Sequence, residues 1–236
     1  MEQQMTATCH IEKIGTTTQQ LEDVVVVESH IQAYIWDDGV ENPLEISFIC
    51  SPNQVRELVV GYMITEGYIS SLEQIHKIDV LQERERIDIW ARLHTQEEKE
   101  KVQQKVLPKV PISYELIGMQ ARVTLESSTL FQQTGALHIA SLWIGEEEFI
   151  TYSDIGRHNA IDKVVGKAVI EGVNLGEMSL FTSGRIPYHM VRKSIVAGIP
   201  ILASRSAPTD QSILLARKHN LTLLGFVRGT TINYYY

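Results

Sequence analysis

The chain has 236 residues, of which 44% are hydrophobic and 21% charged, the composition of an ordinary folded globular protein that forms one large domain or two small ones. Its formal net charge is −8, divided between −13 for residues 1–150 and +5 for residues 151–236, where ten Lys/Arg stand against five Asp/Glu. Neither a dense basic stripe nor an apolar run of bilayer length is present, so we expect a cytoplasmic protein that binds a small anion rather than nucleic acid or membrane.

The first part of the chain, residues 1–105, predicts a small α+β region. Strands rich in β-branched and aromatic residues are expected over residues 21–29, 30–36 and 44–50, and a strand pair over residues 75–78 and 87–90. Ser51 and Pro52 supply an N-cap and a first-turn proline for a helix over residues 53–66. Residues 94–105 are polar and charged and are expected to form a solvated helix or connector at the boundary.

The second part, residues 106–236, predicts a domain in which helices and strands alternate. Helices are expected over residues 125–133, 157–171, 187–197 and 209–218, and strands over residues 136–144, 149–152, 179–182, 199–203 and 221–226. Such alternation is typical of an α/β fold with a layered sheet and right-handed crossovers. We therefore expect this α/β domain to follow the smaller N-terminal region.

Two neighbouring loops of the second domain combine small hydroxyl residues with an arginine. Residues 182–185 read Thr-Ser-Gly-Arg and residues 204–209 read Ser-Arg-Ser-Ala-Pro-Thr, each between an apolar run and a helical pattern. The unpaired N–H groups at a helix start and the guanidinium fork both suit phosphate. A third basic glycine turn lies at Arg228 and Gly229. The alternative interpretation is that the hydroxyl residues only cap helices and the arginines are solvated.

A second polar cluster lies where a predicted strand meets a helix. It contains Asp154, Arg157, His158, Asp162 and Lys163. On a helix His158 and Asp162 share a face, so the carboxylate could orient the imidazole, while Arg157 would add positive charge to an anion site. The alternative interpretation is a capping aspartate and a surface pair. His138, inside an apolar strand, is expected to be a hydrogen-bonded core histidine.

Missing motifs exclude several other chemistries. The sequence contains no HExxH pair, no GxxxxGK[ST] loop, no GxGxxG after the first strand, no GxSxG elbow, and neither the H-x-E nor the P-C-x-x-C of zinc deaminases. We expect no metal site and no serine triad. The two cysteines, Cys9 and Cys50, are far apart, so no disulfide framework is expected and both are expected to be inert thiols.

With these residues laid out, the chain resembles the FdhD/NarQ family of formate dehydrogenase accessory sulfurtransferases over nearly its whole length. The matching motifs are residues 42–46 (NPLEI), 61–69 (GYMITEGYI), 134–138 (TGALH), 154–166 (DIGRHNAIDKVVG), 182–185 (TSGR), 197–209 (AGIPILASRSAPT) and 225–229 (GFVRG), with Asn233 and Tyr235. The resemblance implies a cytidine-deaminase-like α/β domain, a homodimer and a role in maturing a molybdenum enzyme.

The resemblance also implies a ligand and partners. Family members take sulfur from a cysteine desulfurase and pass it to molybdenum bis(molybdopterin guanine dinucleotide) before that cofactor enters formate dehydrogenase or a related molybdoenzyme. The family segment that matches residues 226–231 is assigned to cofactor binding, and GDP is expected to mimic the cofactor. The predicted binding residues are Asp154, Arg157, His158, Asp162, Lys163, Ser183, Gly184, Arg185, Ser204, Arg205, Ser206, Thr209, Phe226, Val227, Arg228, Gly229, Thr230 and Thr231.

Roles can be assigned within this set. Arg185, Arg205 and Arg228 are predicted to contact phosphate, and the loop serines, glycine and threonine to donate from backbone and hydroxyl groups. Asp154 or Asp162 is predicted to hold the guanine base or a neighbouring arginine, because a carboxylate accepts the paired N–H donors of guanine.

One family feature is missing from this chain. Family members usually carry a C-x-x-C loop whose cysteine forms a persulfide, and its expected place between Ala91 and Tyr114 contains no cysteine. Since sulfur transfer needs a thiolate, no catalytic residue is assigned. Three functions stay open: a sulfur carrier that uses Cys9 or Cys50, a chaperone that binds and delivers the cofactor without sulfur chemistry, and a small-molecule enzyme with a His158–Asp162 acid/base pair. The pathway is inferred from the family, and the chaperone is favoured as the mechanism.

Overall fold

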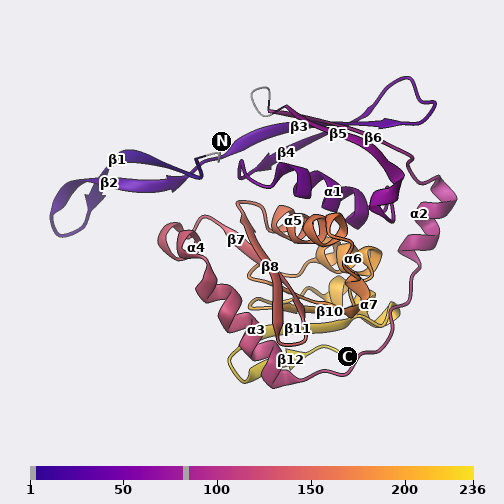
Figure 1. Ribbon diagram of the computed structural model, residues 1–236. Helices are drawn as coiled ribbons and strands as arrows, with labels where there is room; N and C mark the ends of the chain where they lie inside the picture. Colours follow the sequence, from indigo (N-terminus) through magenta and orange to yellow (C-terminus); the bar gives the residue numbers. More distant parts are fainter. Residues whose placement is uncertain (1–3, 82–84) are drawn as a thin grey trace.

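The computed structural model describes residues 4–81 and 85–236, which form three β-sheets, of which the four-stranded and the six-stranded one are packed against helices (Figure 1). In chain order the elements are β1 (Thr6–Ile14), β2 (Thr18–Val26), β3 (Ser29–Asp37), β4 (Leu44–Cys50), α1 (Val55–Thr65), η1 (Leu72–Gln74), β5 (Ile75–Leu81), β6 (Arg86–Ala91), α2 (Gln96–Gln103), α3 (Tyr114–Ser127), α4 (Thr129–Thr134), β7 (His138–Ile144), β8 (Glu147–Asp154), α5 (Arg157–Ile170), η3 (Leu175–Glu177), β9 (Ser179–Thr182), α6 (Tyr188–Ala197), β10 (Ile201–Ser204), α7 (Asp210–Lys218), β11 (Thr222–Arg228) and β12 (Thr231–Tyr234). The predicted mixed α/β class is confirmed.

Strands β1 and β2 form an antiparallel hairpin that projects from the rest of the molecule (Figure 1). The sequence predicted no strand before residue 21, whereas the structure places β1 at Thr6–Ile14. The reason is that polar side chains separate the few apolar residues of β1, so no buried face is visible in its pattern. The hairpin leads directly into β3, the first strand of the next sheet.

The four-stranded sheet has the order β4-β3-β6-β5, and the predicted pairing of β5 with β6 is confirmed. Ile31, Ala33 and Ile35 of β3 alternate with less buried residues and join the core. Helix α1 begins at Val55 with Gln54 as N-cap, so the predicted N-cap Ser51 is wrong. The backbone N–H of Ser51 instead donates to a distant carboxylate, described below.

The six-stranded sheet has the order β12-β11-β10-β9-β7-β8. Strands β9, β10 and β11 run parallel, and α6 and α7 connect them as predicted. Every residue of β9 (SLFT) and β10 (ILAS) is buried, and the apolar residues of each strand are adjacent rather than alternating, as expected for parallel strands covered on both faces. The antiparallel edge strand β12 was not predicted, because it is short and largely exposed.

Helices cover both faces of this sheet (Figure 1). Helices α5, α6 and α7 contribute to the main core, whereas α3 packs on the opposite face through Ile117 and Ala121. The prediction that a helix begins at residue 125 is wrong, because α3 already begins at Tyr114. Within the described residues, no helix is long and apolar enough to span a membrane.

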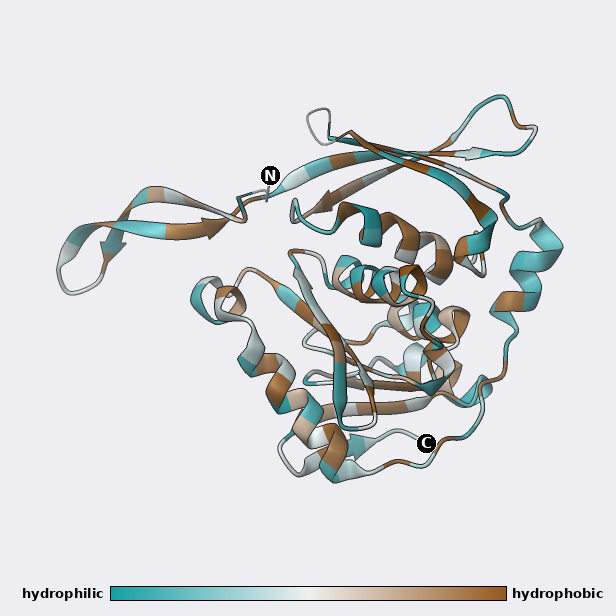
Figure 2. Cartoon of the chain, viewed as in Figure 1, coloured by the Kyte–Doolittle hydropathy of each residue, from teal (hydrophilic) through white to brown (hydrophobic). Residues whose placement is uncertain are grey.

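Helices α1 and α5 touch through glycine. A Cβ on Gly61 would lie 1.7 Å from the carbonyl oxygen of Asp162, and a Cβ on Gly166 would lie 1.9 Å from that of Glu57. One apolar core therefore continues from the four-stranded sheet through α1 and α5 to the six-stranded sheet. Figure 2 shows apolar residues concentrated on these central elements. The division of the chain at residue 105 stays a prediction.

Candidate functional site

The two Ser/Arg loops follow the carboxyl ends of the neighbouring strands β9 and β10 and are hydrogen-bonded to each other. Ser204 Oγ donates to the carbonyl oxygen of Gly184 at 2.7 Å, and Ser206 Oγ donates to that of Ser183 at 3.0 Å. The structure thus brings both loops together at one edge of the sheet. The Ser204 side chain is fully buried in this contact, so it holds the loops rather than facing solvent.

Arg205 and Arg228 line one cavity of about 490 Å³. The residues around it are Ala121, Arg122, Leu125 and Glu126 of α3, Phe131 and Gln132 of α4, and Arg205, Val227, Arg228 and Gly229. None of Arg122, Arg205 and Arg228 forms an ion pair with a residue in the described part of the chain. Sequence reasoning missed Arg122 and Glu126, although their i,i+4 spacing is a signal once the helix start is known.

The segment from Phe226 to Thr231 contains the end of β11, the turn at Gly229 and Thr230 and the first residue of β12, and it adjoins this cavity. The backbone N–H of Phe226 donates to the carbonyl oxygen of Ser206 at 3.1 Å. The φ angle of Phe226 is 50°, a left-handed conformation that is rare outside glycine and must be held by its surroundings. A Cβ on Gly118 of α3 would lie 2.1 Å from the carbonyl oxygen of Gly229. The turn is therefore fixed to both the second loop and α3.

The remaining loop residues divide between exposed and structural positions. Arg185, Thr230 and Thr231 are exposed, and Arg185 lies outside the residues that line the cavity. The backbone N–H of Thr209 donates to Ser212 Oγ at 2.8 Å at the start of α7. Thr209 thus takes part in a helix start, in agreement with the capping alternative for this residue.

Asp154 and Lys163 form a buried ion pair. Lys163 Nζ lies 2.7 Å from Asp154 Oδ2, and the backbone N–H of Ser51 donates to the same oxygen at 3.0 Å. The second oxygen of Asp154 accepts from the backbone N–H of Gly156 and from Asn159. Both predicted binding residues therefore stabilise the junction between β4 and α5, and neither side chain is exposed to a ligand.

Asp162 belongs to a second buried network. Its carboxylate accepts from Thr65 Oγ1 at 2.7 Å and forms an ion pair with Lys193 Nζ at 2.9 Å. Burial raises the pKa of Asp162 and lowers that of Lys193, against the attraction of the pair. The prediction that Asp162 orients His158 is wrong: within the described residues, its hydrogen bonds go to α1 and α6 instead.

Arg157 and His158 occupy the first turn of α5, beside Gly184. A Cβ on Gly184 would lie 3.0 Å from Cβ of Arg157 and 3.5 Å from Nδ1 of His138. Nε of Arg157 and Nε2 of His158 are buried and find no hydrogen-bond partner among the described residues. Burial, reinforced by Arg157 and Lys193, lowers the pKa of His158 to about 4, so the imidazole is neutral at pH 7.

His138, which was predicted to be a hydrogen-bonded core histidine, borders the first loop. It is half-buried at the start of β7, and its Nδ1 lies 3.5 Å from Ser183 Oγ. Burial, with Arg157 nearby, lowers its pKa below the usual value. The first loop therefore faces two histidines and an arginine on its α5 side, and these positions carry no free carboxylate because Asp154 and Asp162 are paired.

Neither thiol belongs to the Ser/Arg loops or lines the cavity beside Arg205 and Arg228. Cys50 is fully buried at the end of β4, and burial, followed by the charge of Asp154, raises its pKa to about 12. Cys9 is partly exposed on the projecting hairpin. The segment where the C-x-x-C loop was expected contains α2 and the extended chain before α3.

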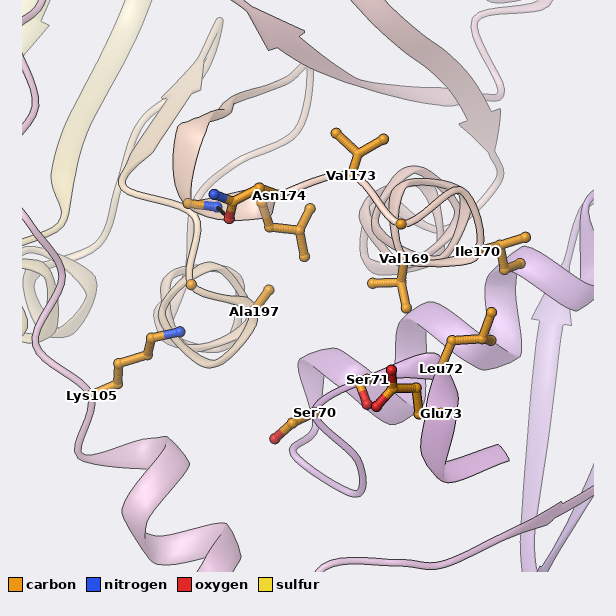
Figure 3. Close-up of a pocket in the computed structure, with 14 residues that line it drawn as sticks. Ser70, Ser71, Leu72, Glu73, Lys105, Val169, Ile170, Val173, Asn174 and Ala197 are labelled. Atoms are coloured by element: carbon orange, nitrogen blue, oxygen red, sulfur yellow. Dashed lines mark hydrogen bonds between the residues drawn. The ribbon is translucent and has the colours of Figure 1, made fainter. Parts of the chain in front are cut away.

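A separate cavity of about 520 Å³ lies away from the predicted site (Figure 3). It lies between the segment that contains Ser70 and Glu73 and the segment that contains Asn174 and Gly176. Lys105 reaches across from the connector, and its Nζ would be 2.5 Å from a Cβ on Gly198 at the end of α6. None of the predicted binding residues lines this cavity.

Comparison with known proteins places the chain in a family. The FdhD/NarQ family model matches residues 40–110 and 94–236. Protein FdhD of Methanocaldococcus jannaschii is 34% identical over 229 residues, covering 94% of this chain and 92% of that protein. The sulfur carrier protein FdhD of Methanothermobacter thermautotrophicus is 32% identical over an alignment that covers 83% of this chain and 84% of that protein.

A solved structure extends the likeness to the whole fold. The crystal structure of a proposed formate dehydrogenase accessory protein from Desulfotalea psychrophila superposes with a TM-score of 0.84 at 26% identity, covering 98% of this chain and 97% of the other. The sequence motifs, the hydrogen-bonded Ser/Arg loops and these matches lead to one conclusion: this chain belongs to the FdhD/NarQ family.

Proposed function

We propose that the protein binds molybdenum bis(molybdopterin guanine dinucleotide) as cargo during the maturation of formate dehydrogenase or a related molybdoenzyme. The observation that carries the proposal is the cavity in which Arg122, Arg205 and Arg228 converge from three separate segments. Unpaired guanidinium forks bind phosphate oxygens in bidentate geometry, and the cofactor carries phosphates in both of its halves. The names of the relatives support the pathway.

The residues around this cavity fit a phosphorylated nucleotide. A volume of about 490 Å³ lies within the usual range for small-molecule sites. Glu126 supplies a carboxylate that can accept the paired N–H donors of guanine, the role first predicted for Asp154 or Asp162. Leu125 and Phe131 add apolar surface for a base. The cavity therefore combines positive charge for phosphate, a carboxylate acceptor for guanine and an apolar wall for the base.

The α5 side of the first loop offers further donors. Nε of Arg157 and Nε2 of His158 are buried without a partner among the described residues, and the Arg157 side chain packs directly against Gly184 of the first loop. Buried polar atoms without a partner are rare in folded proteins, so an incoming group that pairs with them would remove a cost. These atoms support a contact with the cargo on this side of the loop as well.

We favour delivery of the cofactor without a persulfide on this chain. Cys50 is buried and protonated at pH 7, so it offers no thiolate for attack on sulfur. In this role the protein would act in the cytoplasm as a homodimer and meet two partners, a cysteine desulfurase that supplies sulfur and the client molybdoenzyme. Sulfur would then reach the bound cofactor directly from the desulfurase.

The alternative function is that of a sulfur carrier, as the names of the relatives state, and it would depend on the Cys9 thiol. Its thiol is partly exposed on the projecting hairpin and is the accessible one of the two cysteines. Normal maturation of formate dehydrogenase with the Cys9→Ser variant would rule this alternative out. The small-molecule enzyme loses its support, because the Asp162 carboxylate is bonded to Thr65 and Lys193.

Calorimetric titration with GDP and ADP tests the proposal. Wild type should bind GDP in preference to ADP, and Arg205→Ala should weaken GDP binding about tenfold, in line with the loss of a charged hydrogen bond worth about 1.5–3 kcal/mol. Arg217→Ala is the matched control, since Arg217 is also exposed but lies in the last turn of α7 and does not line the cavity. Absence of binding by either nucleotide would overturn the proposal.

A further inference from the structure

The four-stranded sheet ends at β5 with an open edge. In the order β4-β3-β6-β5, β5 pairs with β6 on one side. On its other side, the backbone groups of residues 76–81 have no hydrogen-bond partner among the described residues. A free strand edge presents a row of N–H and C=O groups with which another extended chain can pair. The backbone of β5 can therefore accept one more strand.

The burial of β5 shows that the core beside this edge is incomplete. Helix α1 lies under the sheet (Figure 1). Val80 stands opposite Ile87 of β6 in the strand register, so both side chains point to the side of the sheet that faces the core. Ile87 is 0% exposed, whereas Val80 is 37% exposed. The layer between the sheet and α1 is thus open at β5, and an added strand would close it.

Two adjoining cavities form a groove along this opening. The first, of about 510 Å³, is lined by Arg56 of α1, by Leu72, and by Ile75, His76, Lys77, Ile78 and Val80 of β5. Leu72 also lines the cavity of about 520 Å³ in Figure 3, where Lys105 lies on the opposite side. We call the two cavities together the edge groove. It follows β5, passes Leu72 and reaches Lys105.

Basic side chains dominate the edge groove, although it lies mostly in the acidic half of the chain. The Lys and Arg residues that line it are Arg56, Lys77 and Lys105, against one carboxylate, Glu73. Lys77 pairs with a neighbouring aspartate of β5, whereas Arg56 and Lys105 form no ion pair within residues 4–81 and 85–236. Figure 3 shows Glu73 beside Leu72, across the cavity from Lys105. Each cavity therefore offers one cation that a carboxylate can pair with.

Lys105 is held at its end of the groove by the chain around it. Its carbonyl oxygen accepts a hydrogen bond from Nδ1 of His219 at 2.7 Å. The backbone N–H of Leu107 donates to the carbonyl oxygen of His219 at 2.9 Å, and the Leu107 side chain is buried. The backbone that carries the ammonium group is thus fixed in advance, so less conformational freedom is lost when a carboxylate binds.

The two features that commonly protect a strand edge leave most of β5 open. A bulge interrupts pairing only between Ile75 and Lys77, at the start of the strand, and residues 77–81 keep a regular register. Lys77 pairs with Asp79, and its Nζ lies 4.7 Å from the ring centroid of Trp90. The Lys77 side chain is therefore held against its own sheet rather than across the edge.

We propose that an extended segment of another protein binds in the edge groove as an additional strand on β5. Its backbone pairs with β5, and apolar side chains at alternate positions fill the open layer above α1. Acidic side chains of the segment pair with Arg56 and, beyond Leu72, with Lys105. A small molecule would satisfy neither the row of backbone groups nor cations in two separate cavities. The site is independent of cofactor binding, because no residue of the groove lines the cavity beside Arg205.

Panning of phage-displayed random peptides against the immobilised full chain tests the proposal, with peptides of about eight residues to match β5. Enriched sequences should alternate apolar with polar residues and carry Asp or Glu near their ends. A synthetic peptide of the most enriched sequence should bind in fluorescence anisotropy, and Arg56→Glu and Lys105→Glu should each weaken binding at least fivefold. Lys109→Glu is the matched control, since Lys109 is exposed on the same connector as Lys105 but lines neither cavity.

Hydrogen exchange of the full chain with and without this peptide locates the contact. Amides of residues 76–81 should exchange more slowly when the peptide is bound. Failure to enrich any sequence, unchanged exchange in β5, or equal affinity of wild type and Arg56→Glu would overturn the proposal. A dimer that the peptide dissociates in sedimentation velocity would show that a second copy covers the edge, and would overturn it as well. GDP titration in the presence of the peptide should be unchanged and reads the proposed function separately.

Discussion

Lys163 Nζ lies 2.7 Å from Asp154 Oδ2, with neither side chain exposed to solvent. Lys163 also donates to the side-chain oxygen of Asn53 at 3.0 Å, and Asp154 accepts from the backbone N–H of Ser51. The pair therefore joins the chain that leads into α1 to the start of α5. Its members are about a hundred residues from their partners before α1, so the contact forms only when the tertiary fold is complete.

Replacement of Lys163 by methionine should lower the free energy of unfolding by about 3–5 kcal/mol, because Asp154 would stay buried without its counter-charge. Urea unfolding followed by circular dichroism measures the change. Lys167→Met is the control, since Lys167 is one turn further along α5 and pairs near the surface with Glu171, so its loss should leave the free energy of unfolding nearly unchanged. A similar small loss for Lys163→Met would show that the buried pair is not structural.

The crossing of α1 and α5 should not tolerate a single methyl group. A Cβ on Gly61 would overlap the carbonyl group of Asp162, so the two helices would have to move apart. We expect Gly61→Ala to lower the thermal midpoint, with a destabilisation of about 3 kcal/mol from overpacking. Gly15→Ala, where the nearest atom is 3.8 Å away, should leave the midpoint unchanged in the same calorimetric scan.

Stability should fall in mild acid because of His158. The pKa of His158 is about 4 in the native state and near 6.5 in the unfolded chain. Between these two pH values the imidazole is therefore protonated in the unfolded state and neutral in the native state. The free energy of unfolding should therefore decrease as pH falls from 6.5 toward 4, by about 1–2 kcal/mol after allowance for partial exposure. His158→Gln should flatten this slope in urea unfolding at several pH values, whereas the exposed His30→Gln should keep it.

Base preference should depend on Glu126. We expect Glu126→Gln to reduce the preference for GDP over ADP about tenfold, because a neutral amide accepts the two N–H donors of guanine less well than a carboxylate. The exposed Glu115→Gln, on the same helix but outside the cavity, is the control. Competition calorimetry with both nucleotides gives the ratio. An unchanged ratio would place the base elsewhere.

Local patterns predicted much of the second domain. The strands β9 and β10 and the helices after them were visible because buried apolar runs and amphipathic stripes are local signals. The positions of the Ser/Arg loops, directly after these strands, were predicted correctly for the same reason. Strands β1 and β12 and the first turns of α3 were missed, because exposed or weakly periodic segments resemble connectors until their neighbours are known.

The polar network around α5 could not be predicted from local sequence patterns. From the sequence, Asp154, Asp162 and Lys163 are near neighbours of His158 and were assigned to its site. Their actual partners are distant in the chain, since Asp162 binds Thr65 and Lys193. The direction in which each carboxylate points depends on how the helices pack, and residue spacing within one helix does not predict that packing. Arg122 was missed for the same kind of reason, because its helix had no predicted start.

The hydrogen bonds from Ser204 and Ser206 to the preceding loop affect the rates at which a nucleotide binds and leaves. With Phe226 tied to Ser206 as well, the backbone around the arginines is already ordered before any nucleotide arrives. Association then requires little reordering of the chain, and only the exposed guanidinium groups lose freedom. Differences in nucleotide affinity should therefore be expressed in how long a bound molecule stays rather than in how fast it enters.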